Sequence, residues 1–179
     1  MRLIARLLGC LCLLATGAVG LSTASAGAAT LGSTHLDPAK TDFSVPCGSE
    51  SCTFLQKRLP GATLRAPFSG DIRKWRVLVP SGPHQYQLVV MHKKRNGKFK
   101  NVGQSSPELI NGPGVFKGSS AGLSIRKGDY IGINGDSVQG IERGKTLGLG
   151  FEPALEFPDA AKPHFTSTSE FQFNATLRH

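Results

Sequence analysis

The chain has 179 residues, with 21 Lys and Arg residues against 12 Asp and Glu, so its formal charge at neutral pH is +9. This length excludes two large domains, and a composition of 39% hydrophobic and 18% charged residues excludes a disordered or fibrous chain. The excess of positive charge favours anionic partners and leaves the chemistry of the protein open.

The first 26 residues have the pattern of a secretory signal peptide. Arg2 and Arg6 give the start a positive charge, and residues 7–21 are apolar and uncharged. The Ala-Ser-Ala sequence ending at Ala26 suits cleavage by signal peptidase, and cleavage two residues later would serve nearly as well. The Leu-Leu-Gly-Cys sequence ending at Cys10 resembles a lipobox, but most of the apolar stretch follows that cysteine instead of preceding it. No second apolar run follows, so we predict a secreted chain without a transmembrane segment.

The two cysteines that remain after cleavage, Cys47 and Cys52, are separated by Gly-Ser-Glu-Ser. Export to an oxidising space favours a disulfide between them. A redox pair would favour the Cys-x-x-Cys spacing, and a zinc site would need two more ligands nearby. Residues 27–46 are rich in small residues and Thr, so we expect a flexible leader there and a folded domain over 47–179.

Short apolar and polar alternations, separated by Gly, Pro, Asn and Ser, fill the rest of the chain. Every second residue from Phe171 to Leu177 is apolar, which is the period of a half-buried strand over residues 169–177. Asn96-Gly97 between two extended runs indicates a hairpin with a type I′ turn. Further strands are predicted at residues 53–59, 63–68, 70–79, 85–93, 98–105, 123–125, 130–134 and 146–151. We therefore predict an all-β fold, a two-sheet antiparallel sandwich of jelly-roll or immunoglobulin-like type.

Several of these segments resemble those of a known group of proteins. They are Cys52-Thr53-Phe54, Leu59-Pro60-Gly61, Ala66-Pro67-Phe68-Ser69-Gly70, Ile72, Trp75-Arg76-Val77, Arg126-Lys127-Gly128-Asp129-Tyr130-Ile131-Gly132 and Phe171-Gln172-Phe173-Asn174-Ala175. Over nearly all of its mature length, the chain resembles a group of exported β-sandwich proteins from high-GC Gram-positive bacteria, a group without an established activity. The resemblance implies the sandwich fold and bacterial export, and it lends no catalytic residue.

One motif is typical of hydrolases. Gly118-Ser119-Ser120-Ala121-Gly122 fits the Gly-x-Ser-x-Gly pattern, which places a nucleophilic serine on a strand-to-helix turn. Here Gly112-Pro113-Gly114 precedes the motif and a new strand follows at Leu123, so a Gly/Ser loop between strands is favoured. The five histidines are scattered, so a catalytic or metal-binding histidine would have to be assembled from distant loops. We predict no catalytic residue and no cofactor.

Two further groups of residues could bind a ligand, Ca²⁺ in one case and a sugar in the other, but a structural role explains each of them. Asp129, Asn134 and Asp136 offer oxygen ligands of the kind that Ca²⁺ prefers, but turn chemistry explains them as well, and we predict no metal site. Trp75 would be the main ring for stacking on a sugar. Because it shares a strand face with Val77, a core position is favoured.

Charge is distributed unevenly along the chain. Residues 53–106 hold eleven Lys and Arg residues against one acid, Asp71, which gives a net charge of +10, and the rest of the mature chain has −3. Five of these cations gather around the predicted hairpin: Lys93, Lys94, Arg95, Lys98 and Lys100. One interpretation is a charged edge that prevents aggregation. The other is a binding site for anionic polysaccharide, cell-wall polymer or lipid headgroups, since export and the lack of aromatic neighbours other than Phe99 argue against nucleic acid.

We therefore predict a secreted, non-catalytic β-sandwich with a binding or structural role at the cell envelope. One alternative is an extracellular hydrolase with a site built from loops, which requires a histidine and an acid to converge beside a serine. The other alternative is a self-associating structural surface protein, which would expose an apolar sheet face.

Overall fold

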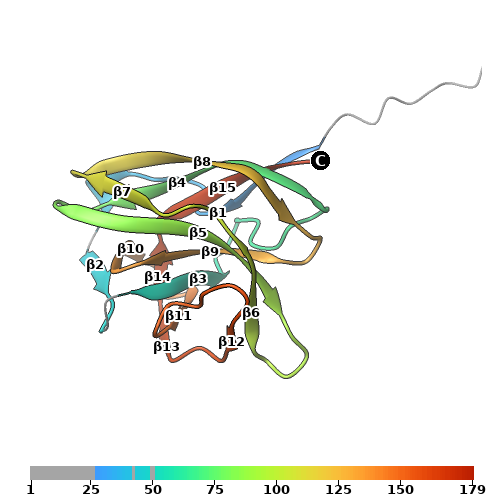
Figure 1. Cartoon of the computed structure of the whole chain (residues 1–179). Coiled ribbons are helices and arrows are strands. Elements are labelled where there is room, and N and C mark those ends of the chain that lie inside the picture. Colours follow the sequence, from blue (N-terminus) through green and yellow to red (C-terminus); the bar gives the residue numbers. More distant parts are fainter. Residues whose placement is uncertain (1–26, 42, 49–50) are drawn as a thin grey trace, which may run out of the picture.

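The computed structural model describes residues 27–41, 43–48 and 51–179, and these form an almost entirely β structure (Figure 1). In chain order the elements are β1 (Ala28–Gly32), the 3-10 helix η1 (Pro38–Lys40), β2 (Phe43–Pro46), β3 (Cys52–Arg58), β4 (Gly70–Val79), β5 (Pro83–Lys93), β6 (Phe99–Gln104), β7 (Glu108–Asn111), β8 (Gly114–Ile125), β9 (Tyr130–Gly135), β10 (Ser137–Glu142), β11 (Leu147–Phe151), β12 (Ala160–Ala161), β13 (Phe165–Ser167), β14 (Ser169–Phe171) and β15 (Phe173–Arg178). The expected signal peptide, residues 1–26, lies outside the described residues.

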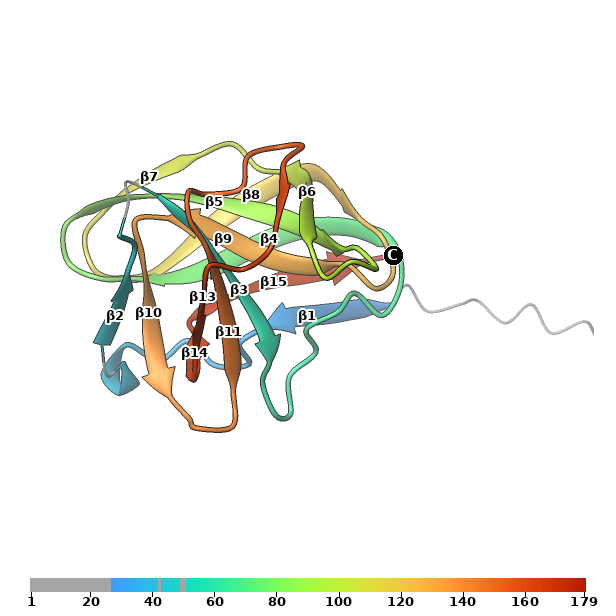
Figure 2. The same cartoon turned by 90° about the horizontal axis from the view of Figure 1, so that it is seen from below.

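Two large sheets make up the body of the sandwich. One has the strand order β1-β15-β4-β8, and the other has the order β12-β6-β5-β9-β3-β11-β13, with β7 also paired to β5. A small third sheet has the order β14-β10-β2, and Figure 2 shows β2 and β10 side by side at one end of the molecule. The paired strands are antiparallel throughout, which confirms the predicted antiparallel sandwich.

The main core is an apolar cluster to which both large sheets contribute. Trp75 and Val77 of β4 and Phe173 of β15 belong to one sheet, and Leu88 of β5 and Ile133 of β9 belong to the other. All five side chains have no exposed surface. Removing this apolar surface from water is the main stabilising contribution to such a fold. The core position predicted for Trp75 is confirmed.

Strand β5 is buried on both of its faces. Leu88 and Val90 belong to the main core, whereas Val89 and Met91 belong to a second apolar cluster together with Leu155 from the segment after β11. A strand that is covered on both sides needs consecutive apolar residues, which explains the run Leu-Val-Val-Met. The end of β5, from which the basic hairpin starts, is therefore held from two sides.

The segment expected to be a flexible leader instead supplies two strands. β1 pairs with β15 from Ala28 opposite Arg178 to Gly32 opposite Asn174, and Leu31 is fully buried. β2 pairs with β10. These strands of five and four residues are too short to show a clear two-residue period, and their backbones pair with strands that would otherwise be sheet edges.

Two other expected strands also differ from the structure. Residues 63–68 form no strand and contribute one isolated bridge, between Arg65 and Tyr130, because Pro67 has no N–H group for a ladder. The strand expected over 169–177 passes from the small sheet to a large one at Gln172, so it is divided into β14 and β15.

Candidate functional site

The predicted hairpin is present between β5 and β6, and it projects from the body of the sandwich (Figure 1). Lys94 N–H donates to Lys98 O at 2.8 Å, and Gly97 N–H donates to Lys94 O at 3.1 Å. Gly97 has a φ of 81°, whereas no other residue type has a positive φ in the described ranges. The predicted type I′ turn is therefore wrong, because it needs positive φ at both central residues; a turn followed by a glycine bulge joins the strands instead.

The basic hairpin, defined by Lys93, Lys94, Arg95, Lys98 and Lys100, carries its charge into solvent. The first four side chains are exposed and Lys100 is half-buried. None of the five forms an ion pair with a described residue. Their charges are therefore balanced by solvent ions and not by protein acids.

The base of the hairpin differs from its tip in its charged surroundings. β12 pairs with β6, with Ala160 opposite Lys100, and Asn101 N–H donates to Asp159 O at 2.9 Å. This pairing brings an acid, Asp159, and a further exposed cation, Lys162, next to β6. The base of the hairpin thus has one acid and one cation beside it, while the exposed tip cations form no ion pair with a described residue.

A cavity of about 510 Å³ lies beside the base of the hairpin. Its walls come from the ends of β5, β6 and β8, the turn before β9 and the segment after β11. The lining residues are His92, Lys100, Val102, Ser124, Arg126, Asp129 and Phe157. Lys100 belongs to both the hairpin and the cavity.

A histidine and a buried aspartate form a pair in this cavity. Asp129 is only 2% exposed; its Oδ1 accepts from His92 Nδ1 at 2.7 Å, and its Oδ2 accepts from Arg126 N–H at 3.2 Å. Because Nδ1 donates to the carboxylate, Nε2 is the remaining ring nitrogen, and it forms no hydrogen bond with a described residue; the side chain is 55% exposed. The register of the antiparallel strands β5 and β9 explains this pair. Met91 lies opposite Tyr130, so His92, which follows Met91, lies near Asp129, which precedes Tyr130.

This geometry corresponds to two of the three parts of a hydrolytic triad, the base and the acid that orients it. Ser124 lines the same cavity, but its Oγ donates to Asp71 Oδ1 at 3.0 Å. No hydrogen bond joins Ser124 to His92 in the part of the chain that the structure describes. The arrangement therefore lacks the serine–histidine contact that activates a nucleophile.

A second histidine–aspartate pair lies at the opposite ends of β5 and β9. His84 Nδ1 donates to Asp136 at 2.9 Å, and His84 Nε2 lies 3.2 Å from Ser81 O, so both ring nitrogens already face protein oxygens. Tyr86 packs against this ring, with 6.1 Å between centroids. Burial raises the pKa of Tyr86 above its ordinary value, with Ser137 opposing the shift and the charge of Asp136 adding to it. This pair leaves no free nitrogen for a ligand.

The oxygen ligands considered for Ca²⁺ do not converge. Asp129 and Asp136 stand just before and just after β9, at opposite ends of a six-residue strand. Asn134 Oδ1 accepts from Thr53 Oγ1 at 2.6 Å, so it is engaged within the protein. The turn interpretation of these residues fits the structure better than a shared metal site.

Glu170 is another buried carboxylate, and both of its oxygens are also engaged. Ser33 Oγ donates to Oε1 at 2.5 Å, and Arg143 Nε pairs with Oε2. Glu170 lines a cavity of about 490 Å³ together with His35 and Glu142. Because the carboxylate is fully used by Ser33 and Arg143, its observed role is to join β14 to neighbouring segments.

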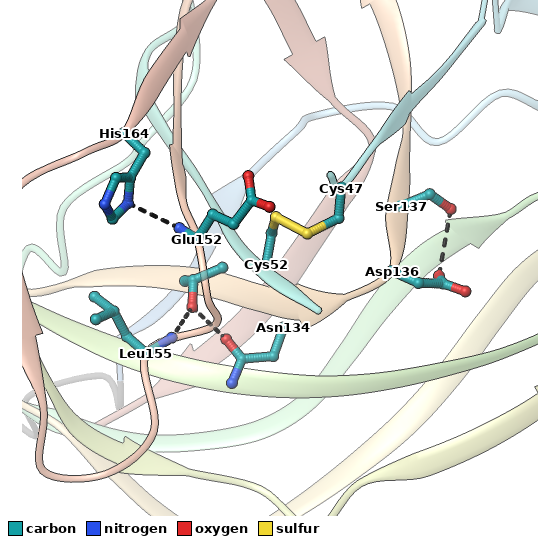
Figure 3. The surroundings of a disulfide bond; sticks show 9 residues. Cys47, Cys52, Asn134, Asp136, Ser137, Glu152, Leu155 and His164 are labelled. Carbon is teal, nitrogen blue, oxygen red and sulfur yellow. Dashed lines mark hydrogen bonds between the residues drawn. A yellow bond between two sulfur atoms is a disulfide. The ribbon is translucent and has the colours of Figure 1, made fainter. Parts of the chain in front are cut away.

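The predicted disulfide between Cys47 and Cys52 is confirmed (Figure 3). The carboxylate of Glu152 lies within 4.8 Å of both sulfur atoms, and Glu152 N–H donates to His164 Nδ1 at 3.0 Å. Since the two sulfur atoms are bonded to each other, this cluster is a structural link in the oxidised protein. It fixes the start of β3.

The Gly-x-Ser-x-Gly motif lies inside β8, neither on a strand-to-helix turn nor in the expected loop. Three residues of β8, including Ser120, stand opposite one residue of β4, so the strand bulges here. Gly122 in the bulge has a φ of 80°. A side-chain carbon at Gly118 would lie 2.2 Å from the ring of Trp75. Both glycines of the motif are therefore explained by the structure, Gly122 by its positive φ and Gly118 by its contact with Trp75.

No protein family model, curated protein or solved structure matches the chain. Within the described residues, no helix has the length and hydrophobicity needed to cross a membrane. The residues that sequence reasoning missed are His92, Arg126 and Phe157, which join the predicted Lys100 in one cavity. The sequence predicted a turn at Gly128-Asp129. It did not predict that Asp129 contacts His92, because this contact depends on the register of β5 and β9, which no local pattern encodes.

Proposed function

We propose that this chain is an exported, non-catalytic binding protein that attaches to anionic polymers of the cell envelope through the basic hairpin. The observation that carries the proposal is the set of four exposed cations at a projecting tip, none of them paired with a described acid. Acidic polysaccharide, cell-wall polymer and anionic lipid headgroups share the required chemistry. The signal-like first 26 residues support export.

Electrostatics explains why the tip would dominate such binding. The tip cations lie within one turn of a two-stranded ribbon, so their potentials add over a Debye length of about 8 Å at physiological salt. Isolated surface cations are screened from one another at larger separations. A polyanion that meets the tip also releases condensed counterions, so its binding weakens with added salt.

The test is co-sedimentation of the mature protein with vesicles. We expect binding to phosphatidylglycerol vesicles at low salt, no binding to phosphatidylcholine vesicles, and a steep loss of binding as salt is added. Dextran sulfate and neutral dextran provide the same comparison for a polysaccharide. Absence of binding to every anionic surface at low salt would contradict the proposal.

An extracellular hydrolase is the second candidate, and the His92–Asp129 pair beside Ser124 is the observation that favours it. The hydrogen bond from Ser124 to Asp71 argues against it, because the serine hydroxyl is not directed to the histidine. A fluorophosphonate probe separates the two. Labelling of Ser124 or Ser120, lost on substitution by Ala, would establish the hydrolase; we expect no labelling.

Self-association receives no comparable support. The exposed large hydrophobic residues within the described ranges are Phe43, Val102, Leu109 and Phe157. Val102 and Phe157 line one cavity, whereas Phe43 lies on β2 of the small sheet and Leu109 on β7, so the four do not make up a single apolar sheet face.

A further inference from the structure

The cavity beside the basic hairpin has both cationic and apolar walls. Lys100 and Arg126 line it, and neither forms an ion pair with a described residue. Val102 and Phe157, which are 38% and 57% exposed, line it as well. Its volume of about 510 Å³ falls within the roughly 300–1,000 Å³ typical of small-molecule sites. These walls match a ligand that has an anionic group next to an apolar group.

The acid in the cavity has both of its oxygens engaged by protein donors. Both oxygens of Asp129 are occupied, one by the His92 ring and one by the Arg126 N–H group, and the carboxylate is buried beneath them. Protein donors therefore engage this carboxylate, and Lys100 and Arg126 give the lining two positive charges against its one negative charge. The hydrogen bond also fixes the ring, with Nδ1 facing the carboxylate.

We propose that this cavity binds an oxyanion that carries an apolar group, such as an alkyl phosphate. The anionic oxygens accept hydrogen bonds from Arg126 and Lys100, since a guanidinium group recognises such oxyanions through paired N–H donors. The apolar part lies against Val102 and Phe157. This inference goes beyond the proposed function, because the hairpin recognises charge alone whereas the cavity selects for the apolar group.

Calorimetric titration of the mature protein with three small probes tests the proposal. Octyl phosphate should bind. Inorganic phosphate should bind with an affinity lower by a factor of about ten or more, because it leaves Val102 and Phe157 uncovered. Octyltrimethylammonium, with the same alkyl chain and the opposite charge, should not bind. Equal affinity for octyl phosphate and inorganic phosphate, or no binding of octyl phosphate, would overturn the proposal.

Two substitutions place the ligand in the cavity. Arg126→Gln should weaken octyl phosphate binding about tenfold, the usual effect of losing a charged hydrogen bond. Phe157→Ala should weaken octyl phosphate binding and leave inorganic phosphate binding unchanged. Arg73→Gln, which removes an exposed cation on β4, is the matched control and should bind as wild type does. Wild-type affinity in both cavity variants, with the fold intact by circular dichroism, would contradict the assignment.

The same variants keep this proposal apart from the hairpin proposal. Lys94→Glu with Arg95→Glu should abolish vesicle binding and preserve octyl phosphate binding, so each proposal can be contradicted without the other.

A competition experiment distinguishes two sources of the ligand, and both of its results are consistent with a ligand site in the cavity. If octyl phosphate displaces the protein from phosphatidylglycerol vesicles, the ligand is a membrane lipid; if vesicle binding is unaffected, the ligand is a free amphiphile.

Discussion

Replacing Gly118 with Ala should destabilise the protein by forcing Trp75 out of its packed position. The added carbon would lie 2.2 Å from one ring atom of Trp75 and 2.5 Å from two others, against 3.4 Å or more for an ordinary contact. The ring has no free space to retreat into, because Trp75 is fully buried and packs edge-on against Phe116. Overpacking of this kind costs about 1–3 kcal/mol, which exceeds the roughly 0.5–1 kcal/mol gained by replacing a strand glycine.

Thermal unfolding followed by tryptophan fluorescence measures the effect directly, because Trp75 is the single tryptophan of the chain. Each kcal/mol corresponds to a fall in Tm of about 2–4 °C for a protein of this size. Ser119→Ala is the control, since the neighbouring side chain on β8 is exposed. Equal Tm values and unchanged emission spectra for the two variants would refute the packing argument, and with it the structural explanation of the Gly-x-Ser-x-Gly motif.

Two further predictions concern processing and alkaline stability. Exported protein should begin at Gly27 or Ala29 and should gain the mass of two hydrogens on reduction of the Cys47–Cys52 disulfide, which intact mass spectrometry detects; free thiols in fresh protein would contradict it. Because burial raises the pKa of Tyr86, the folded state holds its proton where the unfolded state loses it, so stability should fall as pH rises above about 10. Tyr86→Phe should make the denaturant midpoint less dependent on pH in that range, and an identical decline in the two proteins would contradict the assignment.

The sequence predicted those elements of the fold whose boundaries are marked by nearby residues. β4 spans Gly70–Val79, as the sequence indicated, because its apolar residues and the flanking Gly and Pro mark both ends. The disulfide followed from two cysteines close in sequence. The expected leader was missed because its strands are stabilised by pairing with β15 and β10, which lie more than ninety residues further along the chain.

The candidate site was predictable only in part. The cations of the hairpin are neighbours in sequence, so their clustering could be inferred from one turn. The His92–Asp129 pair joins residues 37 positions apart through the register of β5 and β9, and Phe157 arrives from a segment positioned by β12. Their convergence is a property of tertiary pairing, and a single sequence contains no periodic signal for it.

The central claim is that the tip of the basic hairpin dominates binding to anionic surfaces. The most direct measurement compares two double variants in co-sedimentation with phosphatidylglycerol vesicles across a salt series. Lys94→Glu with Arg95→Glu reverses two tip charges, and Arg73→Glu with Lys74→Glu reverses an adjacent pair that is also exposed, on β4 of the other sheet. The account predicts that the first variant loses binding while the second keeps most of it, because the second leaves the cluster of tip cations intact. Equal binding by the two folded variants would contradict it.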